Sequence, residues 1–299
     1  MWDIRFLDND LFSIFYNFII YGFFGWIYES CYVSVKKGEV VNRGFLNGPI
    51  IPIYGLGATI VIVTLSSLED QIVLVFFGGM ILASILEYLT SFLMEKLFHA
   101  KWWDYSDLKY NLKGRICLRS SIFWGFLSVL AVKVLTPFSD TLIEYIPRRS
   151  GEYAAYVILA VFITDLLVTV VSTMQLDKKL TIMSKLREEF KEYIASTRLY
   201  EATEEVYEKY AESQISDIID KFKDKLENNI ERIEALELKD KKDDIYEKLK
   251  AFTSRYQKTV EHKNLVHLRI LKAFPDFKAI NKEGALKDLK ARLHIRKKR

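Results

Sequence analysis

The ionisable side chains of Glu29, Glu87, Arg119 and Asp165 lie inside stretches of the sequence that are otherwise long and apolar. A charge placed within a membrane costs about 2.5–3.5 kcal/mol even on the mildest scales, so each side chain needs a partner or a function. A carboxylate in an apolar wall is suited to general acid–base work. Asp165 stands alone near the middle of its stretch, where it is expected to face a cavity or a partner unless neighbouring threonines satisfy it.

Two loops next to these positions carry further polar and aromatic residues. Residues 42–57 (NRGFLNGPIIPIYGLG) predict a re-entrant or half-broken start of a helix, because irregular backbone at membrane depth persists only inside protein or beside a wet cavity. Residues 102–117 are rich in Trp and Tyr, which indicates either an anchor at the headgroup level or part of a polar site. The candidate site residues are Glu29, Arg43, Asn47, Tyr54, Glu87, Glu95, Trp103, Asp104, Tyr105, Arg115, Arg119 and Asp165.

The apolar stretches have the length of membrane-spanning helices. A helix that crosses an apolar core of about 30 Å needs about 20 residues. The first stretch has no basic leader and no A-x-A cleavage site, so we expect it to stay as an anchor. The predicted spans are residues 11–33, 49–65, 72–93, 116–137 and 153–174.

Lys and Arg residues in the short loops predict the orientation of these spans. The loops after the first and third spans contain eight of them, against three on the opposite side. We therefore expect the N-terminus outside, the C-terminal part in the cytoplasm, and Glu29, Glu87 and Arg119 together in the cytoplasmic leaflet. These three residues would form either a structural ion pair that locks three spans together or a polar site open to the cytoplasm.

Charge divides the chain into unlike parts. Residues 1–175 carry 13 Lys and Arg against 15 Asp and Glu, and the remainder carries 30 against 24. Within residues 176–274, apolar stripes at 219–236 and 245–260 flank a polar break and predict an antiparallel helical hairpin or a longer coiled coil. Residues 275–299 form a basic tail, either a frayed solvated end or a contact with anionic lipid.

The predicted fold is therefore all-α: a polytopic membrane protein of about five spans with a cytoplasmic helical arm. Two cysteines are too few for a disulfide framework, and four scattered histidines lack metal-ligand spacing, so we expect no metal and no cofactor. The net charge of +4 does not indicate nucleic-acid binding. No GxxxxGK[ST] or GxGxxG pattern occurs, so the chain has no recognisable nucleotide-binding loop.

Five motifs occur in order: residues 25–29 (GWIYE), 42–57, 87–91 (EYLTS, followed by Glu95), 102–105 (WWDY) and 114–118 (GRICL, followed by Trp124 and Gly125). Together they resemble the motifs of a bacterial membrane family described as putative ABC-transporter type IV. The resemblance covers roughly residues 10–175 and implies a permease-like subunit of a transport system in the cytoplasmic membrane. Without a Walker motif, such a subunit would need a separate ATPase or an ion gradient, and so few spans imply a homo-oligomer.

Two other functions stay open from the sequence. A membrane-embedded enzyme acting on an amphiphilic or lipid-linked substrate would use these charged groups at the headgroup level, although no nucleophile–base–orienter set is visible. A membrane scaffold would instead recruit a partner through its coiled-coil arm. Co-purification distinguishes the three: an ATPase favours transport, a bound lipid favours an enzyme, and a coiled-coil partner favours a scaffold.

Overall fold

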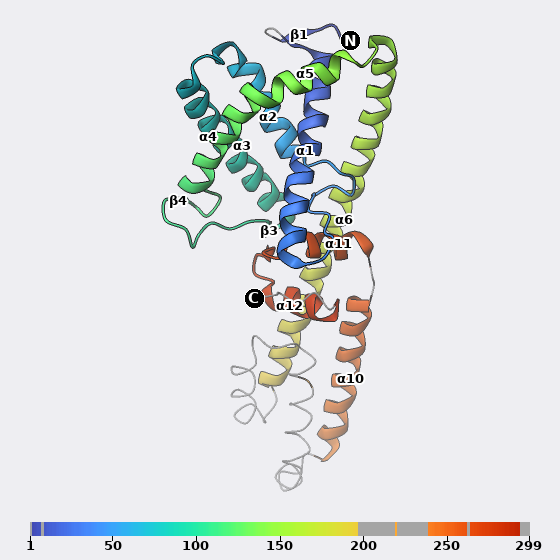
Figure 1. Cartoon of the computed structure of the whole chain (residues 1–299). Coiled ribbons are helices and arrows are strands. Elements are labelled where there is room, and N and C mark those ends of the chain that lie inside the picture. Colours follow the sequence, from blue (N-terminus) through green and yellow to red (C-terminus); the bar gives the residue numbers. More distant parts are fainter. Residues whose placement is uncertain (1, 7–8, 197–218, 220–238, 262–263, 294–299) are drawn as a thin grey trace. The chain divides into compact units, whose positions relative to one another are not determined.

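The computed structural model describes residues 2–6, 9–196, 219, 239–261 and 264–293, and these are mainly helical (Figure 1). The predicted all-α polytopic fold is confirmed. The chain divides into two compact units, each described by itself below. The first, called here the membrane unit, consists of residues 1–173 and 272–277, and the second consists of residues 174–271 and 278–299.

Four helical stretches of the described residues are long and apolar enough to cross a membrane, and a fifth apolar helix is shorter. The predicted second span, residues 49–65, corresponds to this shorter helix, which begins only at Pro52. A total of five spans therefore stays a prediction. The long stretches are α1 (Leu11–Lys37), α3 (Ile72–Phe98), Leu118–Glu144 and α6 (Arg148–Ser196), and the short one is α2 (Pro52–Leu65) with the 3₁₀ turn η1 (Ser66–Leu68).

The stretch Leu118–Glu144 is built from three pieces: α4 (Leu118–Leu130), the π-helical turn η2 (Ala131–Leu135) and α5 (Thr136–Glu144). Pro137 lacks a backbone N–H, so the regular hydrogen-bond ladder is interrupted here and the preceding turn is widened. The Thr136 hydroxyl donates to the carbonyl oxygen of Ala131 at 2.8 Å, and the Tyr21 hydroxyl of α1 lies 3.3 Å from the same Thr136 oxygen. The widened turn is thereby joined to α1.

Small residues set the close packing of α3 against α4. A Cβ atom added at Gly79 would lie only 2.2 Å from Cβ of Ser128, so glycine is required at this crossing. Nearby, the hydroxyls of Ser84 and Ser121 are hydrogen-bonded at 2.8 Å. Helices in a membrane associate through small residues and interhelical hydrogen bonds of this kind, because lipid leaves no hydrophobic driving force between them.

Residues 38–51, between α1 and α2, form neither helix nor strand and pack on α1. Leu46 is 1% exposed, the Ile51 N–H donates to the Gly22 carbonyl at 3.0 Å, and the Trp26 indole donates to the Asn42 side-chain oxygen at 2.8 Å. Parts of this irregular segment are thus buried against α1, as irregular backbone at membrane depth requires. A re-entrant position in the bilayer stays a prediction.

In the second unit, the C-terminal part of α6 packs against α10 (Lys239–Glu261), which is followed by α11 (Leu265–Ala273) and α12 (Glu283–Arg292). The rings of Phe190 and Phe252 stack with centroids 4.7 Å apart. In the predicted stripe 245–260, the side chains of Leu249, Phe252, Tyr256 and Val260 are buried. The other stripe, 219–236, lies outside the described residues except for Ile219, so the hairpin between the two stripes stays a prediction.

The strands are only two residues long and lie in the segments outside the helices. In the β4–β5 hairpin, Lys113 and Gly114 both have positive φ, 54° and 69°, as the central residues of a primed turn have, and the Arg115 N–H closes this turn on the Leu112 carbonyl at 3.0 Å. This hairpin leads directly into α4. The strands are β1 (Arg5–Phe6) paired with β2 (Asn9–Asp10), β4 (Asn111–Leu112) paired with β5 (Ile116–Cys117), and β3 (Ala100–Lys101) and β6 (Lys278–Ala279).

Candidate functional site

Glu87 of α3 is 4% exposed and accepts hydrogen bonds from three neutral donors. The Tyr105 hydroxyl donates to Oε1 at 3.1 Å, while the Ser120 hydroxyl and the Trp124 indole donate to Oε2 at 3.3 and 2.9 Å. The described residues provide no ion-pair partner for this carboxylate. Hydrogen bonds therefore compensate its burial, as a buried charge requires.

The local sequence explains how two of these donors reach Glu87. Cys117 is the N-cap of α4, with its sulfur accepting from the Ser120 N–H at 3.4 Å and its own N–H donating to the Ser120 hydroxyl at 3.2 Å. This reciprocal cap fixes the first turn of the helix. Trp124 follows Ser120 by four residues and so lies on the same helix face.

Tyr105, the third donor, comes from the loop before the β4–β5 hairpin. Its N–H donates to the carbonyl of Gly114 at 2.8 Å, which ties the loop to the hairpin. Burial raises the pKa of the Tyr105 phenol, and the neighbouring Glu87 raises it further. Tyr105 therefore stays protonated, and remains a donor, throughout the neutral range.

Glu29 of α1 is held by Tyr54 of α2 and Arg43 of the 38–51 loop. The Tyr54 hydroxyl donates to Oε1 at 2.8 Å, and Nε of Arg43 lies 3.7 Å from Oε2. A Cβ atom at Gly25, one turn before Glu29, would lie 2.4 Å from Cγ of Tyr54. Only glycine at position 25 lets the Tyr54 ring lie against α1 and reach this carboxylate.

Arg43 is a buried cation with incomplete hydrogen bonding. Its Nε and Nη1 atoms are buried and have no hydrogen-bond partner among the described residues. Its guanidinium lies over the ring of Phe274, 4.1 Å from the centroid. Burial lowers the pKa of Arg43 and Glu29 raises it, and the group stays charged because a guanidinium is not deprotonated in proteins.

A second ion pair joins the loop before α4 to α3. Nη2 of Arg115 donates to Glu95 at 3.0 Å, Nη1 donates to the Tyr88 hydroxyl at 3.2 Å, and the guanidinium also lies over the Tyr88 ring. The Trp103 indole donates to the carbonyl oxygen of Arg115 at 3.0 Å. These contacts position the hairpin, and through it the start of α4.

The two aspartates among the candidates stabilise loops. The Asp165 carboxylate of α6 accepts from the backbone N–H groups of Asn47 and Gly48 at 3.1 and 2.7 Å, and from the Asn47 side chain at 2.8 Å. It thereby fixes the end of the 38–51 loop. Asp104 accepts from the Ser106 N–H at 3.1 Å and lies 3.6 Å from the Lys101 ammonium.

Arg119 does not join Glu29 and Glu87. Its side chain is exposed, and no hydrogen bond or ion pair to it is found within the described part of the chain. Of the two arrangements that the sequence leaves open for these residues, the three-residue ion pair does not occur in the part of the chain that the structure describes. Glu29 has Tyr54 and Arg43 as partners, and Glu87 has neutral donors. No cluster of three or more His, Cys, Asp or Glu able to hold a metal ion occurs in the described residues.

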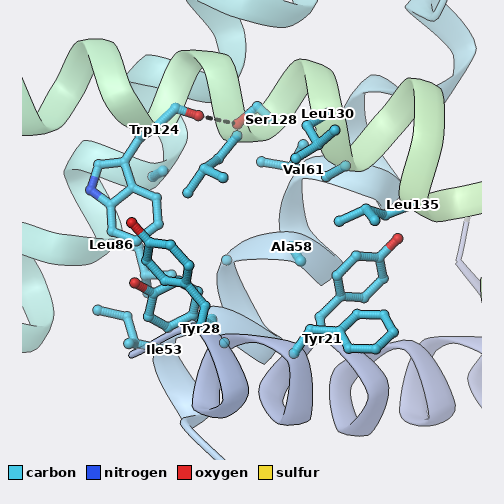
Figure 2. Close-up of a pocket in the computed structure, with 17 residues that line it drawn as sticks. Tyr21, Tyr28, Ile53, Ala58, Val61, Leu86, Trp124, Ser128, Leu130 and Leu135 are labelled. Carbon is cyan, nitrogen blue, oxygen red and sulfur yellow. Dashed lines mark hydrogen bonds between the residues drawn. The ribbon is translucent and has the colours of Figure 1, made fainter. Parts of the chain in front are cut away.

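An apolar cavity of about 220 Å³ lies between α1, α2, α3 and the α4–η2 segment (Figure 2). Figure 2 shows Trp124 and Tyr28 toward one end and Tyr21 and Leu135 toward the other. The lining residues are Tyr21, Phe24, Gly25, Tyr28, Ile53, Tyr54, Gly57, Ala58, Val61, Ala83, Leu86, Trp124, Leu127, Ser128, Leu130, Ala131 and Leu135.

Two lining residues connect this cavity to the carboxylates. Tyr54 and Trp124 have ring centroids 5.5 Å apart, in an edge-to-face contact. The Tyr54 hydroxyl donates a hydrogen bond to Glu29, and the Trp124 indole N–H donates one to Glu87. The cavity therefore has an apolar body and, behind one wall, two carboxylates and a guanidinium.

The list of candidates from the sequence misses Ser120, Trp124 and the apolar lining. A signal for them exists: Tyr21, Gly25 and Tyr28 recur at steps of four and three on α1, as Ser120 and Trp124 do on α4. Both sets lie in mainly apolar helices, where such spacing is hard to distinguish from that of the neighbouring apolar residues.

No curated protein and no solved structure shows significant similarity to the chain. A family model described as putative ABC-transporter type IV matches residues 16–170, more than half of the chain. This segment contains the cavity and every candidate residue named above. The apolar helices and this match identify a membrane protein, and the chain belongs to the putative ABC-transporter type IV family.

Proposed function

We propose that the chain is the permease-like membrane subunit of a transport system and that its substrate binds in the cavity beside Tyr54 and Trp124. The observation that carries this proposal is the link between the apolar cavity and the two carboxylates through these rings. A largely apolar pocket with a few placed polar groups is the usual form of a small-molecule site. The substrate class that fits is partly apolar.

The energy source would lie outside this chain. The sequence has no phosphate-binding loop, so movement against a gradient requires a separate ATPase subunit or an ion gradient. We propose the second unit as the docking element for such a partner, because α6 contributes to both units as one continuous helix. Purification of the full chain from native membranes should then recover a protein with a Walker motif.

Recovery of a coiled-coil protein without any ATPase would instead favour the scaffold function. In the proposed assembly, a homo-oligomer in the cytoplasmic membrane completes the transport path, since few helices surround the cavity of a single chain.

The proposed orientation has the N-terminus outside and the second unit in the cytoplasm, which puts Glu29 and Glu87 in the cytoplasmic leaflet. Ser67 and Lys109 are both exposed and lie on opposite sides in this arrangement. In a background with the exposed Cys31 replaced by serine, Ser67→Cys should react with an impermeant thiol reagent added outside. Lys109→Cys should react only after permeabilisation, and labelling of both from one side contradicts the orientation.

The transport function is tested in a strain that lacks the chain. Comparison of the solutes in cells and medium, by mass spectrometry, should show a difference that the wild-type chain reverses. Ala58→Phe, which fills the cavity from α2, should fail to reverse it. The matched control is Leu56→Phe on the same helix, since Leu56 is 44% exposed and does not line the cavity. Full activity of the Ala58→Phe variant contradicts the proposed site.

A further inference from the structure

The cavity is lined by aromatic rings and by no basic residue. Tyr21, Phe24, Tyr28, Tyr54 and Trp124 contribute rings, and none of the lining residues is Lys or Arg. Aromatic faces carry negative electrostatic potential and attract cations, most strongly where water is excluded. The lining therefore favours a ligand that is both apolar and positively charged over a neutral or anionic one.

The carboxylates behind the rings add to this preference. Glu29 has the Arg43 guanidinium 3.7 Å away, whereas Glu87 receives only neutral donors within the described part of the chain. One negative charge thus lies next to the cavity without a cationic partner. The Trp124 N–H that points to this carboxylate leaves the ring more electron-rich, because hydrogen bonds to a charged group polarise the donor.

Two ring pairs join α1 to the third long stretch beside the cavity. Tyr28 stacks with Phe123 of α4 at 6.4 Å between centroids, and Phe24 lies 6.2 Å from Phe138 of α5. Leu130, which lines the cavity, is 42% exposed. Part of the cavity wall is therefore exposed to the surroundings of the helices, which in a membrane are lipid, so a lipid-soluble ligand could approach from this side.

We infer that the cavity binds a lipophilic cation, an apolar or aromatic molecule that carries a quaternary or protonated amine, and that Glu87 provides the charge that selects it. This inference rests on the proposed function and names the substrate class of the same site. The aromatic body of the ligand lies among Tyr21, Phe24 and Leu127. Its charged nitrogen lies against Tyr54 and Trp124.

The test compares three ligands of similar shape and different charge: phenyltrimethylammonium, its neutral isostere tert-butylbenzene, and the anion benzenesulfonate. Binding is measured by equilibrium dialysis with the full-length chain in nanodiscs, and empty nanodiscs of the same lipid correct for partition. The cation should bind about tenfold more tightly than the neutral isostere. Benzenesulfonate should not compete. Equal affinity for the neutral isostere, tighter binding of the anion, or no saturable binding of the cation overturns the inference.

Variants tie the preference to named residues. Glu87→Gln should lower the ratio of cation to neutral affinity, and so should Trp124→Phe, which keeps an aromatic ring but removes the indole N–H. Both ligands are measured on one preparation, so a partly unfolded sample reduces both signals and leaves their ratio unchanged. Ala58→Phe should abolish binding of both ligands, whereas Leu56→Phe should leave both unchanged. An unchanged ratio in both Glu87→Gln and Trp124→Phe removes Glu87 from the selectivity mechanism.

The outcomes also separate this inference from the proposed function. If Ala58→Phe stops transport in cells while phenyltrimethylammonium shows no preference over tert-butylbenzene, the cavity is the transport site and its ligand is not a cation. If the cation binds as expected and Ala58→Phe leaves transport intact, the cavity is a cation site outside the transport path.

Discussion

The rings of Tyr54 and Trp124 meet with centroids 5.5 Å apart, and each donates a hydrogen bond to a different carboxylate, Glu29 and Glu87 respectively. The donors come from α2 and α4 and the acceptors from α1 and α3, so four helices converge on one ring contact. A change in either ring alters both the wall of the cavity and the position of a carboxylate.

Tyr54→Phe and Trp124→Phe should each lower the free energy of unfolding by about 1.5–3 kcal/mol, because each removes a hydrogen bond to a charged group. The two losses should not add, since the rings touch, and residues in contact usually show a coupling of about 0.5 kcal/mol or more. Thermal unfolding in detergent of the wild type, both single variants and the double variant measures this. Tyr145→Phe is the control, because Tyr145 is 81% exposed. Strict additivity would show that the contact carries no coupling.

Arg115 and Arg119 are four residues apart, but replacement by alanine should lower stability strongly at Arg115 and hardly at all at Arg119. Arg115→Ala removes hydrogen bonds to Glu95 and Tyr88 and should cost about 1.5–3 kcal/mol of stability. Arg119→Ala should change stability by less than about 0.5 kcal/mol, because its side chain is exposed. Melting temperatures of the two variants, purified side by side, measure the difference. A larger loss for Arg119→Ala would restore the ion pair with Glu29 and Glu87.

The Arg119 prediction fails for a geometric reason. The lengths of the apolar stretches and the loop motifs place Glu29, Glu87 and the start of α4 at similar depths, and the structure does bring Glu29 and Glu87 to neighbouring positions around one ring pair. The depth of a residue in the membrane does not, however, say in which direction its side chain points from the helix axis. Successive residues of a helix point about 100° apart, so when Ser120 faces Glu87, Arg119 faces away.

The cavity itself could not be predicted from the sequence. The polar residues of α4, Arg119, Ser120, Ser121 and Ser128, do not gather on one face, so its pattern gives no signal for which side meets α1 and which meets lipid. The cavity depends on the widened turn at Ala131–Leu135 and on the close approach of Gly79 to Ser128, which are properties of the packed helices. The loop motifs are more informative, because they contain Tyr54 and Arg43, which contact Glu29, and Tyr105, which contacts Glu87.

Asp165→Asn should loosen the 38–51 loop. One carboxylate oxygen accepts from the Gly48 N–H at 2.7 Å, and the other accepts from the N–H of Asn47 at 3.1 Å. An asparagine places an NH₂ group against one of these donors, so at least one bond is lost, at a cost of about 1.5–3 kcal/mol. Hydrogen exchange should accelerate in peptides covering residues 45–50. Thr164→Val, which removes only a bond within α6 to the Ala160 carbonyl, should leave that exchange unchanged.

Tyr256 of the second unit should make stability fall at alkaline pH. The Tyr256 hydroxyl donates to Asp288, which also accepts from Arg187 at 2.7 Å. Burial raises the pKa of Tyr256 above its ordinary value of 10.0, and the Asp288 carboxylate raises it further, while Arg187 lowers it. The folded chain therefore keeps this proton at pH values where the unfolded chain has released it.

This difference in bound protons determines how the free energy of unfolding changes with pH. Below about pH 9 both states hold the proton, and Tyr256 contributes no pH dependence. Above the ordinary value of 10.0 the unfolded state binds fewer protons, so the free energy of unfolding decreases by about 1.4 kcal/mol per pH unit until the folded-state pKa is reached. Other groups titrate in this range, so the measured quantity is the difference in slope between the wild type and Tyr256→Phe, which should lose this component. Tyr110→Phe, at an 81% exposed position, should keep the wild-type slope. Equal slopes for the wild type and Tyr256→Phe would show that Tyr256 titrates alike in the folded and unfolded chain.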